Sequence, residues 1–118
     1  MSVNLTRPTP VIPVVPAPNL SQRDALMHAF SVAETVVANL ADEPTTVNIE
    51  RYDSGYRVEI YFHHQPELVA RFAAQYGITT AADPHYNADS STYTSADVLV
   101  DGVTVRGWSL MRHEERAA

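Results

Sequence analysis

Residues 46–63, TVNIERYDSGYRVEIYFH, decide the fold because they have the pattern of a β-hairpin. Apolar residues alternate with polar ones in both halves, as expected of strands with one buried and one solvated face. Between the halves, Asp53-Ser54-Gly55 predicts a three-residue loop with glycine at the left-handed position. The open face of the resulting sheet is then predicted to carry Tyr52, Arg57, Glu59, Tyr61 and His63.

A second hairpin is predicted nearer the C-terminus, with arms at about 92–100 and 103–110. Asp101-Gly102 between the arms is a preferred composition for a two-residue turn. In the last arm, Val103 and Val105 fall on one face of the strand, whereas Trp108 falls on the other. A one-residue bulge at Arg106-Gly107 would bring these apolar residues onto one face.

Two further segments predict helices. Residues 20–41 form the longer one, and a stripe of apolar residues at alternating steps of four and three predicts its buried face. That stripe consists of Leu26, Phe30, Ala33, Val37 and Leu40. Other apolar residues widen it, so we expect this helix to pack against more than one element. Residues 66–76 form the shorter helix, which Pro66 begins and Gly77 ends.

The order helix, hairpin, helix, hairpin predicts an α+β fold, because neither hairpin would be stable alone in water. We expect a two-layer sandwich of order α-β-β-α-β-β, with a mainly antiparallel four-stranded sheet and both helices on one face. Residues 78–81 are a weak candidate for a further short strand.

The termini are predicted to lie outside this single domain, which spans residues 19–112. Residues 1–18 are rich in proline and predict an extended leader, and residues 113–118 predict a flexible tail. The leader is either a stiff segment without contacts or a docking strand. Its candidate partner-docking residues are Val11, Ile12, Val14 and Val15.

Composition excludes several classes of protein. Eight arginines and no lysine stand against 14 acidic residues, giving a formal charge of −6, so we expect no direct binding to nucleic acid. The absence of cysteine excludes disulfides and thiolate metal sites. We find no signal peptide or membrane-spanning pattern, and therefore expect a cytoplasmic protein without a membrane partner. No cofactor is predicted, and no catalytic residue is assigned.

Histidines offer one alternative, a metal or small-ligand site. His63 and His64 end the second strand, and His85 lies in the polar loop at residues 83–91. None of the histidines has the short spacing typical of metal ligands, so we do not assign a metal site.

Polar-tipped aromatic residues suggest a surface for protein contacts, because such side chains bury much area while keeping a hydrogen bond. The candidate binding residues are Tyr52, Arg57, Tyr61, His63, His85, Tyr86 and Trp108. Our first hypothesis is a non-catalytic interaction module that forms a homodimer. Its small, lysine-free and cysteine-free chain would fit an accessory protein of a bacterial mobile element. The alternatives are a small-ligand or metal-binding enzyme near His63, His64 and the 83–91 loop, and an acidic inhibitor of a DNA-binding protein.

Overall fold

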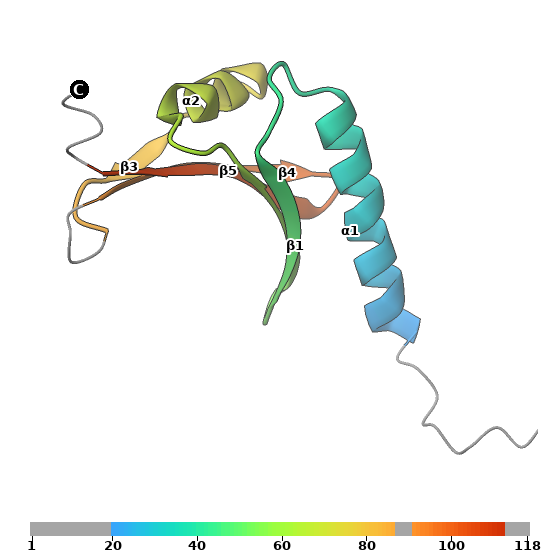
Figure 1. The fold of residues 1–118 in the computed structure, drawn as a ribbon. Helices are drawn as coiled ribbons and strands as arrows, with labels where there is room; N and C mark the ends of the chain where they lie inside the picture. Colours follow the sequence, from blue (N-terminus) through green and yellow to red (C-terminus); the bar gives the residue numbers. More distant parts are fainter. Residues whose placement is uncertain (1–19, 87–90, 113–118) are drawn as a thin grey trace, which may run out of the picture.

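A computed structural model describes residues 20–86 and 91–112, which form two helices and five strands. The elements are α1 (Leu20–Ala38), β1 (Thr46–Tyr52), β2 (Gly55–Tyr61), α2 (Pro66–Gln75), β3 (Ala81–Asp83), β4 (Thr92–Val100) and β5 (Val103–Met111) (Figure 1). The chain is therefore an α+β protein, as predicted. The predicted leader and its docking residues Val11, Ile12, Val14 and Val15, and the predicted tail, lie outside the described residues.

The sheet has five strands in the order β1-β2-β5-β4-β3 and is mixed, so the prediction of four mainly antiparallel strands is wrong. β2 and β5 run parallel, and every other neighbouring pair is antiparallel. The fifth strand, β3, pairs with the outer side of β4. Each hairpin sequence fixes the direction of its own two arms, but nothing local says which arms of the two hairpins meet.

Both predicted hairpins are confirmed, with one difference in a turn. Tyr52 pairs with Gly55, so the first turn contains only Asp53 and Ser54, and Gly55 begins β2 with a φ of 126°. The second turn, Asp101-Gly102, has φ values of 50° and 82°. Two left-handed residues in succession match the twist of antiparallel strands, which explains why this turn was predictable.

One hydrophobic core joins both helices to the same face of the sheet. α1 packs mainly on β2, and α2 packs on β4 and β5, so the two helices cover different halves of the face (Figure 1). The buried side chains of the core are Ala29, Val32, Ala33, Val36, Val58, Ile60, Phe62, Val69, Phe72, Ala73, Ala96, Val103 and Val105.

The predicted end of α2 is confirmed by its backbone hydrogen bonds. Gly77 has a φ of 68° and donates its N–H to the carbonyl of Ala74, at 3.1 Å. Ile78 donates its N–H to the carbonyl of Ala73, at 2.9 Å. These two bonds form a Schellman motif, which satisfies carbonyls at the end of the helix. The chain then turns back towards the edge strand β3.

The predicted buried stripe of α1 is partly wrong. Phe30 is 53% exposed and Val37 is 37% exposed, whereas Ala29 and Val36 are buried. The helix carries two overlapping apolar stripes, and periodicity alone does not rank them. The stripe with small residues faces the sheet, because alanine lets a helix approach closely.

β5 contains no bulge, contrary to the bulge considered at Arg106-Gly107. Its pairing with β4 runs without interruption from Thr92↔Met111 to Val100↔Val103. Gly107 faces the helices, on the same side of the strand as the buried Val105 and Ser109. The Phe72 ring occupies the space above it, and a Cβ at residue 107 would lie 2.7 Å from Phe72 Cδ2. Trp108 therefore points away from the core, to the other face of the sheet.

Candidate functional site

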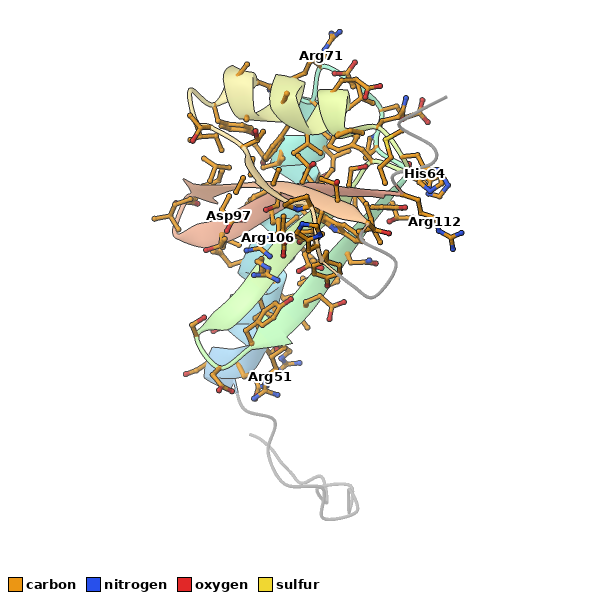
Figure 2. The ribbon with its side chains drawn as sticks, turned by 90° about the vertical axis from the view of Figure 1, so that its left-hand side faces the viewer. Arg51, His64, Arg71, Asp97, Arg106 and Arg112 are labelled. Atoms are coloured by element: carbon orange, nitrogen blue, oxygen red, sulfur yellow. The ribbon has the colours of Figure 1, made fainter. Side chains whose placement is uncertain are left out.

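The face of the sheet opposite the helices is the candidate site, and we call it the open face. Within the described part of the chain, neither helix packs on it. Figure 2 shows Arg106 on the side of the sheet away from α2. Its main side chains come from the central strands β2, β4 and β5. They are Arg57, Glu59, Tyr61, Tyr93, Asp97, Leu99, Thr104, Arg106, Trp108 and Leu110, with Tyr52 from β1.

Four aromatic rings form a continuous row across the open face, which we call the aromatic row. Tyr61 and Trp108 are partners in the parallel β2–β5 register, and their ring centroids are 4.4 Å apart. Trp108 lies 5.6 Å from the ring of Tyr93 on β4. Tyr93 in turn stacks on Tyr86, at 4.7 Å. The row thus links three strands and the segment after β3, and Tyr86 at its end is 54% exposed.

Histidine extends the row beyond β2. The His63 ring lies edge-on to Tyr61, with His63 Nδ1 2.6 Å from the Tyr61 hydroxyl. His63 also stacks on His64, at 3.7 Å between centroids. The two rings are together because β2 ends at Tyr61 and His64 has a left-handed φ of 55°, so strand alternation no longer applies.

His85 does not join these residues. Its backbone N–H donates to the Asp83 carboxylate at 3.0 Å, in a turn after β3. Within residues 20–86 and 91–112, no three histidine or acidic side chains are grouped closely enough to hold a metal ion. Residues 87–90 of the predicted loop site lie outside the described residues, so the metal or small-ligand alternative stays a prediction.

Arg57 and Glu59 form the first of two ion pairs on the open face. Arg57 Nε donates to Glu59 Oε2 at 2.9 Å, and the guanidinium carbon lies 4.1 Å above the Tyr52 ring. The Tyr52 hydroxyl donates to the same carboxylate oxygen, at 2.8 Å. This hydrogen bond to Glu59 is the main reason that the pKa of Tyr52 is raised.

Arg106 and Asp97 form the second ion pair, one strand further along. Arg106 Nε and Nη2 donate to the two oxygens of Asp97 at 2.6 and 2.9 Å, a bidentate arrangement. Arg106 Nη1 also donates to the Tyr93 hydroxyl at 3.2 Å, which connects the pair to the aromatic row. The hydrogen bond from Arg106 lowers the pKa of Asp97 below its ordinary value of 3.8.

The two ion pairs make the same arrangement twice, an arginine held between a carboxylate and a tyrosine. In the parallel register Glu59 lies opposite Arg106, so acidic and basic residues alternate across the strands. Two arginines and two carboxylates cancel in charge. The arrangement holds the polar side chains in fixed positions beside the aromatic row, and it provides hydrogen-bonding groups without a net positive field.

A small pocket lies where the β1–β2 turn approaches the β4–β5 turn. It has a volume of about 200 Å³, which is below the range of roughly 300–1,000 Å³ typical of small-molecule sites. Its lining residues are Tyr52, Ser54, Gly55, Tyr56, Arg57, Gly102 and Thr104.

Part of this site was predicted from the sequence. The structure brings Tyr61, His63 and Trp108 together, and Tyr52 and Arg57 lie against each other in the first ion pair. Tyr86 reaches Trp108 only through Tyr93, which was absent from the predicted set.

The candidate binding residues do not include Tyr93, Asp97 and Arg106, although a signal for the last two was present in the sequence. The Asp101-Gly102 turn sets Val100 opposite Val103. Counting outward from that pair places Asp97 opposite Arg106, as the structure does.

Comparison with models of known protein families, with curated proteins and with solved structures finds no match to this chain. Among the residues that the structure describes, there is no helix long and apolar enough to cross a membrane.

Proposed function

We propose that this protein is a non-catalytic protein-interaction module and that the open face is its binding surface. The aromatic row is the observation that carries the proposal. Trp108 lies in the middle of the row, in contact with Tyr61 and Tyr93. Tryptophan and tyrosine are the residues most often found at the centres of protein interfaces, because each buries a large area and loses little rotamer freedom.

The ion pairs beside the row support a protein partner. They place hydrogen-bonding groups at the border of an aromatic patch, which is the usual anatomy of an interface with an apolar centre and a polar rim. Because Arg57 and Arg106 are already held by Glu59 and Asp97, a partner meets polar groups in fixed positions. Such groups give specificity more than affinity.

Single-stranded nucleic acid is the competing ligand, because bases also stack on rows of aromatic rings. That binding mode needs cationic groups that follow the phosphates. On the open face Arg57 and Arg106 are each paired with a carboxylate, and the whole chain has a formal charge of −6. These charges favour a protein partner over nucleic acid.

The test compares Trp108→Ser with Glu67→Ser, a control change at an exposed residue of α2 that lies away from the open face. Both variants and the unchanged chain serve as baits in a lysate of the source organism, after circular dichroism has shown that each is folded. A captured protein is then purified and its dissociation constant measured with each bait. We expect Trp108→Ser to weaken binding by roughly tenfold or more, and Glu67→Ser to leave it unchanged.

Hydrogen exchange of the complex locates the interface. Protection confined to β2, β4 and β5 supports the proposal. Equal binding by all three baits, or protection only on the helices, overturns it. Binding of an oligonucleotide that Trp108→Ser abolishes would assign the open face to nucleic acid instead.

A further inference from the structure

α1 exposes a row of side chains that the sheet does not use, and we call it the outer stripe. Met27 is 60% exposed and Phe30 is 53% exposed, unusual values for large apolar side chains on a helix that is otherwise packed. The outer stripe consists of Arg23, Met27, Phe30, Glu34 and Val37. Arg23 and Glu34 are both exposed. Within the described residues, neither of these two side chains forms a hydrogen bond or an ion pair.

The outer stripe lies on the free flank of the helix. His28 marks the opposite flank, since its Nε2 lies 2.8 Å from the Asp101 carbonyl oxygen in the β4–β5 turn. Phe30 follows His28 by two residues and so projects about 160° away from it around the helix. Figure 1 shows α1 at the margin of the fold, with the rest of the described elements on one side of it.

The spacing of the outer stripe is that of a two-helix seam. Its residues follow one another at steps of four, three, four and three, which are the steps between d and a positions of a heptad. Met27 and Glu34 then take a positions, and Arg23, Phe30 and Val37 take d positions. The outward side chains of α2 contrast with this pattern, because they are charged, polar or small: Glu67, Ala70, Arg71, Ala74 and Gln75.

We propose that the outer stripe binds a second copy of this chain, with the two α1 helices packed antiparallel about a twofold axis. In an antiparallel pair, each a position lies opposite a d position of the partner helix. The register that puts Met27 opposite Phe30 of the second copy also puts Arg23 opposite Glu34. The twofold axis repeats both contacts, giving two apolar layers flanked by two ion pairs.

Charge complementarity selects the antiparallel direction. In a parallel pair, a faces a and d faces d, so Arg23 would face its own copy and Glu34 would face its own copy. Both contacts would then be repulsive. The antiparallel register turns the same four charges into two attractive contacts, which a twofold axis perpendicular to the helices relates to each other.

This inference does not rest on the proposed function. The outer stripe belongs to the helix layer, whereas the aromatic row lies on the other side of the sheet. A dimer formed through α1 leaves both open faces accessible, so it would present two copies of the binding surface.

Charge reversal tests the inference on the full chain. Sedimentation velocity at several concentrations gives the dimer dissociation constant. We expect Arg23→Glu and Glu34→Arg each to weaken the dimer by roughly tenfold, since each places like charges in both outer layers. The double variant, which exchanges the two charges, restores the original affinity. Asp24→Arg is the matched control, because Asp24 is exposed on the same turn but lies off the outer stripe.

Mixing the two single variants sharpens the test. One variant carries two acidic stripe positions and the other carries two basic ones, so native mass spectrometry is expected to show the mixed dimer in excess over both parent dimers. Phe30→Glu, which places two charges in the central layers, is expected to give a monomer. Circular dichroism shows whether each variant keeps its fold, and exposed positions such as these are not required for it.

Several results would overturn the inference. One is a chain that stays monomeric at about 100 μM, a concentration at which even a weak dimer with a micromolar dissociation constant would be populated. A dimer that none of the charge reversals weakens lies at another surface. A monomer that becomes a dimer when residues 1–18 are deleted would assign the outer stripe to the chain's own leader.

Discussion

The two sides of β5 differ in the size of their side chains. Towards the helices the strand presents valine, valine, glycine and serine, at positions 103, 105, 107 and 109. Towards the open face it presents threonine, arginine, tryptophan and leucine, at positions 104, 106, 108 and 110. From residue 103 to residue 110, the covered side therefore carries the smaller residues and the uncovered side the larger ones, whereas Met111 at the end of the strand is a large residue on the covered side.

This difference agrees with the separate roles that we propose for the two sides. On the covered side, small residues let α2 lie close to the sheet, and the Phe72 ring fills the space above Gly107. On the open side, Trp108 lies outside the hydrophobic core. There it packs between Tyr61 and Tyr93, and we propose that its ring also serves contacts with a partner; the following predictions test this division between the two sides.

The largest expected effect comes from removing the ring that fills the covered side. Phe72 is 2% exposed, so Phe72→Ala is expected to lower the free energy of unfolding by about 3–5 kcal/mol, since a cavity remains in the core. Leu99→Ala on the open side is the control; Leu99 is 69% exposed, and its loss should cost less than about 0.5 kcal/mol. Urea denaturation measures both. Equal losses would mean that a side chain on the open side contributes as much to stability as one in the core, which would contradict the proposed difference between the two sides.

An intermediate effect is expected where the covered side has no side chain. Gly107→Ala places a methyl group against the Phe72 ring and is expected to cost about 1–3 kcal/mol, because the core becomes overpacked. The φ of Gly107 is not in the left-handed region, so the cost comes from the contact rather than from the backbone. A double-mutant cycle with Phe72→Leu measures the coupling by thermal or urea denaturation. Independent, additive effects of the two changes would contradict this explanation.

The smallest effect is expected on the open side, at Asp97. Because the ion pair with Arg106 lowers the pKa of Asp97 below 3.8, its contribution to stability is present above that pH and disappears as the pH falls through the lowered value. The Asp97 side chain is 45% exposed, so screening keeps the contribution of this pair below about 1 kcal/mol. Urea denaturation of Asp97→Asn should show a small loss at pH 7.

The acid limb provides the control for that variant. As the pH falls through the lowered pKa of Asp97, the difference in stability between the two proteins should become smaller. A difference that persisted in acid would show that the substitution acts through packing instead of charge.

The sequence predicted local structure well, for reasons that are local. The Asp101-Gly102 turn and the alternation on either side fixed β4 and β5 nearly to the residue, and Pro66 and Gly77 bounded α2. Each of these signals depends only on residues that are close together in the chain.

The errors arose where distant parts of the chain meet. A bulge at Arg106-Gly107 was considered because Val105 and Trp108 differ in parity, and the sequence does not show that Phe72 lies above Gly107. Phe30 was placed in the core because two stripes on α1 were both apolar, and only contact with β2 distinguishes them. The candidate site was incomplete for the same reason, since Tyr93 joins Trp108 and Tyr86 only after the strands have paired.

The parallel β2–β5 pair has a consequence for the order of folding. Its first partners, Arg57 and Thr104, are 47 residues apart (104 − 57), whereas the arms of each hairpin are neighbours in the chain. Hairpins close within microseconds, and contacts between distant residues form later because a longer loop must be ordered first. We therefore expect the two hairpins to form early and their docking to limit the rate. Until then β2 and β5 each have an unpaired edge, and the central strands of the finished sheet are those most open to mispairing with another chain.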